Sequence, residues 1–372
     1  MDIPEHQAPT LTGPDDAPAA GANRRFRRFL TGMVLVFSAA MAGAIALPHD
    51  PYIRYQSFND TIFDRLSWVY DRLAHDDTPI DVLFVGSSRT ARGADAAGLQ
   101  DALAAAGAGE VHVANISMPA AGLDVRLTNI RTALQHHPEI RLIVLGVVEA
   151  LPRDGHQAFG DLGTARDILT APWIVNRTLP GNLARLPYRQ MELAIASYLP
   201  EAFGYRTEFD PAVYPGPTPD HRDFNRPGWE TGNVPDRPET EPTVDEARAA
   251  RLARESRRYR RAITPPILPE SLAWIEFGVS RHYVREIADL AAAHDAQVAF
   301  LFLPFFQGYE RPIDSAWLAG FGPVWRATHI MDDPRNYADA GHASWRGTEL
   351  ITPWLADRIR TVRDRTAEDE RP

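Results

Sequence analysis

Short apolar runs alternate with helical patterns along much of the chain after residue 79. Residues 80–85 form a short apolar run, which is typical of a strand buried on both faces, and residues 111–116 and 142–148 predict a second and a third strand. Residues 95–106 and 123–134 lie between them and carry apolar side chains at helical spacing. This strand–helix order predicts a parallel sheet whose crossover connections are right-handed.

The same alternation returns near the C-terminus. Residues 271–293 predict a long helix, 298–305 a fourth strand and 329–332 a short fifth strand, and residues 345–362 predict a closing amphipathic helix. The sequence therefore predicts an α/β protein, a three-layer α/β/α sandwich around a parallel, flavodoxin-like sheet.

An insertion at about residues 150–270 separates the two parts of this pattern. Residues 172–199 favour a helix, whereas residues 205–242 are dense in Pro, Gly, Asp and Asn and predict a long irregular loop. Residues 243–246 (TVDE) fit a capping box at the start of a charged helix that ends near Arg261. The arginines of this helix suit a binding face, and they equally suit a solvated helix with ion pairs one turn apart.

The N-terminal pattern differs from the rest of the chain. Residues 1–28 predict a disordered tail that ends in four arginines, and residues 29–47 contain no charge and are long enough to span a bilayer as a helix. We expect a transmembrane signal anchor with its N-terminus in the cytoplasm and residues 48–366 as an exported domain of the inner membrane. A cleaved signal peptide, with a site near residues 44–46 (AIA), and a buried helix of a soluble protein are the alternatives.

Composition excludes several classes of function. A formal charge of −10 over 372 residues argues against a nucleic-acid binder, and the absence of cysteine excludes disulfides and thiolate metal sites. Asp332 and Asp333 have no histidine at a metal-ligand spacing. We therefore expect neither a metal nor a cofactor.

Candidate catalytic residues follow the first and last strands of the predicted sheet. Ser88 follows the first strand, and Asp339 and His342 follow the last. Since ligands of open parallel sheets bind beyond the carboxyl ends of the strands, the three side chains are expected to meet. A serine hydroxyl needs a base to become a nucleophile, and the base needs an acid to orient it. Ser88 as a helix cap, Asp339 as a turn cap and Ser87 as a substitute nucleophile are the alternatives.

An acyl-transfer site also needs N–H donors for the oxyanion. The backbone amide of Ser88 is one candidate, and the turn from Ala120 to Gly122 is another. Asn115 precedes this turn, and its side chain is a further candidate or a turn stabiliser.

Three motifs resemble those of SGNH (GDSL-type) hydrolases. Residues 84–89 (FVGSSR) resemble the block that carries the nucleophile, residues 115–120 (NISMPA) the Asn-led second block, and Asp339-x-x-His342, followed by Gly347, the last block. The closest resemblance is to the branch with alginate O-acetylation proteins and the teichoic-acid D-alanylation protein DltD. It implies transfer or hydrolysis of an O-acetyl group on an extracytoplasmic polysaccharide or envelope polymer, beside a multi-spanning membrane acyltransferase.

The sequence departs from this family at three points. Ser87 stands where an Asp is common, residues 146–149 (GVVE) lack the Asn of the third block, and Ala120 or Gly122 must replace a second-block glycine. Arg89 is a candidate for supplying positive charge near the oxyanion or for holding an anionic sugar. The missing third-block Asn and the long Pro-rich insertion favour the alternative hypothesis, a non-catalytic module that binds polysaccharide or scaffolds an export complex.

Overall fold

Five parallel strands form the centre of the computed structural model, which describes residues 17–219 and 246–369. Their order across the sheet is β2-β1-β3-β4-β5, the order of the flavodoxin-like fold. The strands are β1 (Val82–Val85), β2 (Val113–Asn115), β3 (Leu142–Val147), β4 (Gln297–Phe302) and β5 (Val324–Arg326). The predicted fold class is therefore confirmed.

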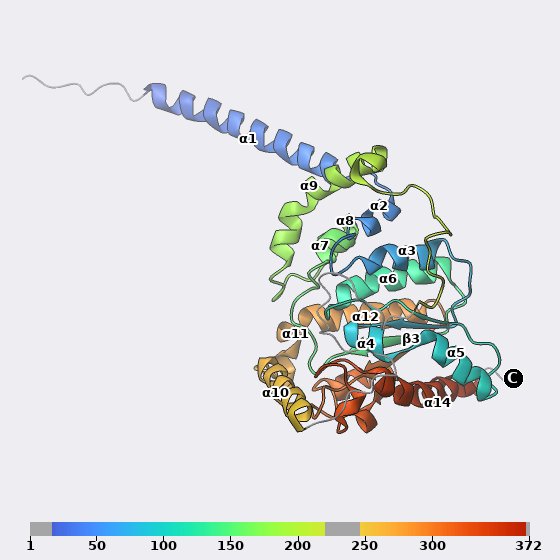
Figure 1. The fold of residues 1–372 in the computed structure, drawn as a ribbon. Helices are drawn as coiled ribbons and strands as arrows, with labels where there is room; N and C mark the ends of the chain where they lie inside the picture. The colour runs from blue at the N-terminus through green and yellow to red at the C-terminus, as the bar shows by residue number, and fades with distance from the viewer. Residues whose placement is uncertain (1–16, 220–245, 370–372) are drawn as a thin grey trace, which may run out of the picture.

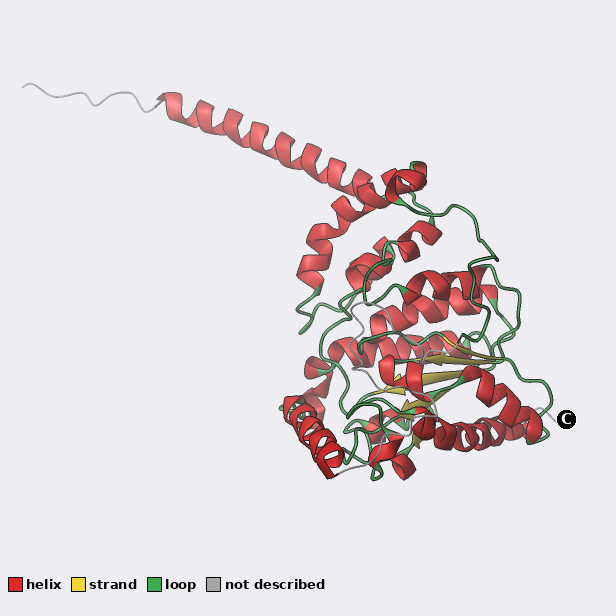
Figure 2. Ribbon diagram, in the orientation of Figure 1, coloured by secondary structure: helices red, strands yellow, loops and turns green. Residues whose placement is uncertain are grey.

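Helices cover both faces of the sheet (Figure 2). One face carries α3 (Arg65–Ala74), α6 (Leu123–His136) and α12 (Gly278–Ala292), and the other carries α5 (Ala96–Ala105) and α14 (Trp345–Asp369). Because strand residues alternate between the faces, Leu83 and Val85 enter the first core and Val82 and Phe84 the second.

A further layer of helices lies outside α3 and α6, on the side from which α1 projects (Figure 1). It contains α2 (Pro51–Gln56), α7 (Phe159–Leu162), α8 (Ala165–Thr170), α9 (Leu179–Tyr198) and the 3-10 helix η1 (Pro200–Phe203). Most of this layer comes from the first part of the insertion. The segment 24–45 of α1 (Ala17–Ile45) is long and apolar enough to cross a membrane, and almost none of it is buried against the protein.

Short helices complete the fold. The helix α4 (Ser88–Gly93) follows β1 directly, and α10 (Glu246–Ala262) lies beside the loops at one edge of the sheet. The remaining ones are α11 (Ala273–Glu276), α13 (Ser315–Leu318), η3 (Glu270–Leu272), η4 (Thr328–Ile330) and η5 (Pro334–Asn336).

Two predicted elements near the C-terminus are wrong in detail. The fifth strand is Val324–Arg326, and the predicted strand at 329–332 falls on η4 and the turn after it. The predicted helix at 271–293 is interrupted at Phe277, whose buried side chain packs in the core between α11 and α12.

The insertion and the N-terminus also differ from expectation. The helix α9 begins at Leu179, three residues after the start expected near Asn176 within the predicted segment 172–199, and Pro180 lies in its first turn, where proline is well tolerated. The helix α1 begins at Ala17, inside the predicted disordered tail, where its alanines favour helix. Residues 205–219 contain neither helix nor strand, as predicted, whereas the rest of that loop and residues 243–245 of the capping box lie outside the described residues.

Candidate active site at the carboxyl edge of the sheet

Ser88 is the first residue of α4, immediately beyond the carboxyl end of β1. The turn from strand to helix is tight because Thr90 packs against two glycines. A Cβ atom at Gly86 would lie 2.2 Å from Thr90 Oγ1, and one at Gly146, on β3, would lie 2.0 Å from the same atom. Glycine at both positions therefore lets α4 sit directly against the strand ends.

Asp339 and His342 lie in a compact turn that closes on itself. The amide of Ala338 donates to His342 O at 2.9 Å, and the amides of Gly341 and His342 donate to Asp339 Oδ1 at 2.8 and 2.9 Å. The amide of Phe306, beyond the end of β4, donates to Ala340 O at 2.9 Å. These bonds attach the late turn to the same sheet edge that carries Ser88.

The structure brings Ser88, His342 and Asp339 together in one hydrogen-bonded chain. Ser88 Oγ lies 2.8 Å from His342 Nε2, and His342 Nδ1 lies 2.8 Å from Asp339 Oδ2. Because an ionised carboxylate only accepts hydrogen bonds, we assign the ring proton to Nδ1. Nε2 then accepts the hydroxyl proton of Ser88, which is the arrangement that general-base activation of a serine requires.

Asp339 is held in its ionised form. Burial acts to raise the pKa of its carboxyl, but hydrogen bonds from His342 and from the amide of Gly341 outweigh burial and lower the pKa to about 2. Its side chain keeps 35% of its surface exposed, and that of His342 keeps 20%. The acid and base are therefore accessible from solvent while Asp339 stays charged over the neutral pH range.

Arg89 is engaged in a buried ion pair. Its Nη1 and Nη2 donate to Glu149 Oε1 and Oε2 at 2.7 and 2.8 Å, and Nη1 also donates to Leu303 O at 2.7 Å. Its guanidinium carbon lies 4.5 Å from the ring centroid of Phe305. Glu149 therefore neutralises the charge of Arg89 in this arrangement, and a role of Arg89 at an oxyanion or an anionic sugar stays a prediction.

Asn115 binds the backbone of α4, the helix that begins with Ser88. Its Nδ2 donates to Ala94 O at 2.7 Å and to Thr90 O at 3.1 Å, and its Oδ1 accepts from the amide of Ser117 at 3.1 Å. Ser87 occupies the N-cap position of α4, is buried and makes no capping hydrogen bond with its side chain. The oxyanion or substrate-binding role that the sequence suggests for Asn115 and Ser87 stays a prediction.

The second-block turn retains backbone donors. Ala120 has φ 64°, a left-handed conformation that favours glycine, so it occupies the conformation for which a glycine is expected in this block. Within the described part of the chain, the amides of Ala120 and Ala121 donate no hydrogen bond. Gly122 has another purpose, because a Cβ atom there would lie 2.3 Å from His156 Cβ.

Three polar residues that the sequence analysis did not single out support this turn. His156 Nε2 lies 2.8 Å from Pro119 O, and burial lowers the pKa of the ring to about 4, so the neutral ring donates this bond. Asp124 accepts the amide of His156 at 2.9 Å, and burial raises its pKa to about 7. Arg126 Nη1 donates to Gly146 O, while its buried Nη2 has no partner among the described residues.

These residues gave little signal in the sequence. His156 lies in the insertion, 37 positions from the carbonyl that it binds. Arg126 lies in the first turn of α6, and the apolar residues of this segment were enough to predict a helix without giving Arg126 a role. Glu149 was placed at the sheet edge by the strand pattern, but its partner Arg89 is 60 positions away.

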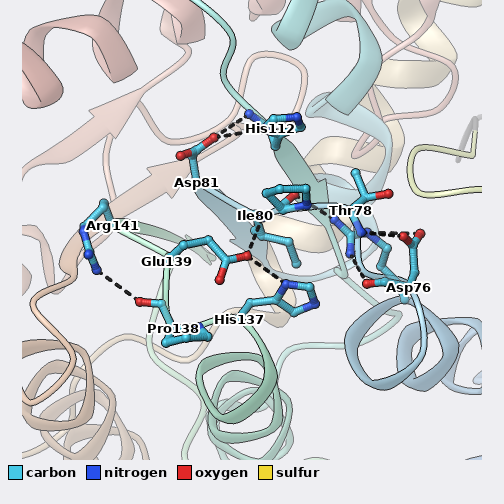
Figure 3. Close-up of polar contacts among 11 residues, drawn as sticks. Asp76, Thr78, Ile80, Asp81, His112, His137, Pro138, Glu139 and Arg141 are labelled. Carbon is cyan, nitrogen blue, oxygen red and sulfur yellow. Dashed lines mark hydrogen bonds and ion pairs between the residues drawn. The ribbon is translucent and has the colours of Figure 1, made fainter.

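The opposite edge of the sheet holds a cavity of about 490 Å³. Its polar lining includes Asp81, His137 and Glu139, shown in Figure 3. Glu139 Oε1 accepts from His137 Nδ1 at 2.9 Å and from the amide of Ile80 at 3.0 Å, and Asp81 Oδ2 accepts the amide of His112 at 2.7 Å. These groups stabilise the start of the strands, and ligands of parallel sheets bind at the other edge.

No protein-family model matches this chain, and no curated protein matches it in sequence.

Proposed function

We propose that this protein is a membrane-anchored serine acyltransferase or esterase of SGNH type. One observation carries the proposal: His342 links the hydroxyl of Ser88 to the carboxylate of Asp339 through contacts of 2.8 Å on each side of its ring. In this proposal Ser88 is the nucleophile, His342 the general base and Asp339 the group that orients the base.

The reaction proceeds in two matched steps. Ser88 Oγ attacks an acyl carbon while its proton moves to His342 Nε2, and Asp339 stabilises the imidazolium that forms. The leaving alcohol takes that proton as the ester bond breaks, leaving an acyl-serine. Water or a sugar hydroxyl then gives its proton to His342 and attacks the acyl carbon, and His342 returns a proton to Ser88 Oγ as the bond between this oxygen and the acyl carbon breaks. Hydrolysis and transfer differ only in this second acceptor.

The amides at the start of α4 and in the second-block turn are the proposed oxyanion donors. They replace the third-block Asn that the SGNH resemblance implies and this chain lacks. Arg126, buried at the same edge, adds positive charge there. Removing one donor from such a site costs on the order of 3 kcal/mol, so we expect slower turnover than in a site with a complete donor set.

The proposed substrate is an O-acetylated polysaccharide or another polymer of the cell envelope. The four arginines before the apolar part of α1 favour a cytoplasmic N-terminus, which places the α/β domain outside the cytoplasm. In the SGNH branch that the chain resembles, such domains work beside a multi-spanning membrane acyltransferase, and we propose the same kind of partner here.

A second candidate function is a non-catalytic SGNH-like module that binds polysaccharide or scaffolds an export complex. It is favoured by the engagement of Arg89 with Glu149 and of Asn115 with the backbone of α4, which removes two side chains from the predicted donor set. A module of this kind needs no reactive serine.

Hydrolysis of p-nitrophenyl acetate by the purified full chain separates the two candidates. We expect activity in the parent, a loss on the order of 10³-fold or more in Ser88→Ala, and little change in the neighbouring Ser87→Ala. A Ser88→Ala variant as active as the parent would remove the catalytic proposal and leave the binding module. An acetylated polysaccharide, with acetate release as the readout, then tests the substrate class.

A further inference from the structure

One face of α9 is apolar although it is exposed. Tyr188, Met191, Ile195 and Tyr198 recur at spacings of three and four residues, and Leu199 follows the helix directly. Their exposed fractions are 61, 38, 53, 79 and 58%. Residues at such spacings share one side of a helix, so these side chains form a continuous stripe, here called the α9 stripe.

The opposite side of α9 is already used by the protein. Leu186, Leu193 and Ala196 are buried, and Leu193 and Ala196 pack against Ile53 of α2. The helix therefore has two apolar sides, of which the fold covers only one. A contiguous exposed apolar surface of this kind marks an interaction with another molecule or with a membrane.

The α9 stripe lies next to the point where α1 leaves the domain. Gln190 Nε2 donates to Ile45 O at 3.1 Å, and Ser197 Oγ accepts the amide of Asp50 at 2.9 Å. Figure 1 shows α9 lying across the end of α1, on the side of the domain from which α1 projects. The apolar surface of α1, exposed along nearly its whole length, thus continues into the apolar surface of α9.

We propose that the α9 stripe lies in the interfacial region of the lipid bilayer that α1 crosses. A bilayer that surrounds α1 up to Ile45 reaches the level of α9, because the two helices are in contact there. Two of the five stripe residues are tyrosines, whose apolar ring and polar hydroxyl suit the boundary between acyl chains and head groups. The same bilayer therefore covers the exposed apolar surface of α1 and the α9 stripe.

This arrangement fixes the height and tilt of the catalytic domain. The layer of α3, α6 and α12 lies between the α9 layer and the sheet, so it holds the sheet that carries the candidate active site away from the lipid surface (Figure 1). A single flexible attachment through α1 would leave that orientation free. The inference rests on α1 as a membrane anchor and is independent of the chemistry of Ser88.

Site-specific fluorescence tests the proposal in the full chain, which has no cysteine of its own. Ile195→Cys on the α9 stripe, Val36→Cys within α1 and Leu350→Cys on α14 are each labelled with an environment-sensitive fluorophore. Leu350, 43% exposed, is the matched control because its helix covers the face of the sheet opposite to α9. Each protein is reconstituted into protein-free phosphatidylcholine vesicles with and without a spin-labelled lipid.

We expect lipid quenching at positions 36 and 195, several-fold stronger than at position 350. Quenching at 36 with none at 195 would overturn the proposal, and so would a chain that shows no quenching at 36. If the fluorophore at position 195 is shielded from water in native membranes but is not quenched by lipid in protein-free vesicles, the proposal is overturned in favour of a protein partner. Repeating the measurement in Ser88→Ala separates this result from the fate of the proposed catalysis.

Discussion

The two edges of the sheet each carry a histidine bound to a carboxylate. At the carboxyl edge, His342 Nδ1 lies 2.8 Å from Asp339, and at the amino edge His137 Nδ1 lies 2.9 Å from Glu139. The other nitrogen separates the two pairs. His342 Nε2 meets Ser88 Oγ, whereas the buried Nε2 of His137 has no partner among the described residues.

For the proposed function, the difference lies in what the second ring nitrogen of each histidine contacts. The amino edge has a cavity, several carboxylates and two histidines, yet no nucleophile among the described residues is hydrogen-bonded to His137. The carboxyl edge has a complete path for a proton from a hydroxyl to an imidazole backed by a carboxylate. The comparison predicts that catalysis depends on the pair that meets Ser88 and is indifferent to the other.

The largest expected effect is that of removing the base. His342→Ala should lower kcat/KM by on the order of 10⁴-fold or more, because Ser88 then has no group to take its proton. His137→Ala is the matched control and should keep the activity of the parent per folded molecule. Ester hydrolysis, with circular dichroism to count folded protein, measures both. Equal losses of activity in the two variants would contradict the prediction that only the histidine at the carboxyl edge acts in catalysis.

Asp339→Asn should have the next largest effect, a loss of roughly 10³- to 10⁴-fold in kcat. An amide oxygen can still accept the backbone amides of the turn, but it cannot stabilise the imidazolium. Glu139→Gln makes the same change at the amino edge and should leave kcat unchanged. Steady-state kinetics of the two variants decide whether the carboxylate acts through the base, and an Asp339→Asn variant with parental kcat would refute it.

Asp339 also gives a stability prediction with a defined pH window. Burial acts to raise the pKa of its carboxyl, but hydrogen bonds from His342 and Gly341 outweigh burial and lower the pKa from an ordinary 3.8 to about 2. A lowered carboxyl pKa stabilises the folded state above the unfolded value, and this contribution is lost as the pH falls through the folded value. The difference in unfolding free energy between the parent and Asp339→Asn should therefore be constant near neutral pH and shrink between about pH 4 and pH 2. Urea unfolding at several pH values measures it, and a difference that stays constant down to about pH 2 would be inconsistent with a lowered pKa.

The ion pair of Arg89 and Glu149 is the next strongest feature of the carboxyl edge. Glu149→Ala leaves the buried guanidinium without a counter-charge and should cost about 3–5 kcal/mol in unfolding free energy. Asp357→Ala, which breaks the exposed pair with Arg360, should cost under about 1 kcal/mol. Chemical denaturation compares them. Similar costs in both variants would mean that burial does not distinguish the two pairs.

The smallest expected effect is at the second-block turn. Ala120→Gly should stabilise the protein by about 1 kcal/mol, because φ is 64° at this position and glycine adopts it without strain. Ala121→Gly, at a neighbour without positive φ, should be neutral or destabilising. Thermal unfolding checks both, and stabilisation by the second change alone would contradict the assigned strain.

The sequence was sufficient for the larger features of the fold. Largely apolar runs identified β1 to β4, because strands buried on both faces carry apolar side chains on both sides. The strand β5 has only three residues, one of them exposed, so its sequence shows almost no strand pattern. The fifth strand was therefore predicted too late in the chain, at the apolar residues within 329–332. Of the outer layer, α9 was predicted as a helix, whereas α2, α7 and α8 were not, because helices of four to six residues are too short to show a helical period.

For the candidate site, the sequence predicted the residues whose side chains form a known catalytic combination, a serine, a histidine and a carboxylate. Ser88, Asp339 and His342 were found from their place after strands, and the structure brings them into contact. The sequence did not predict that Glu149 neutralises Arg89 or that Asn115 binds the backbone of α4. Those contacts depend on which strand ends become neighbours, and spacing along the chain does not encode the resulting distances.

Covalent labelling of Ser88 tests the central claim most directly. The full chain is treated with a serine-reactive fluorophosphonate, and the modified peptide is identified by mass spectrometry in the parent, Ser88→Ala and His342→Ala. The account predicts one adduct, on the peptide that contains Ser88, absent from Ser88→Ala and formed far more slowly in His342→Ala. An unlabelled parent, or an adduct that forms equally in Ser88→Ala, would contradict it.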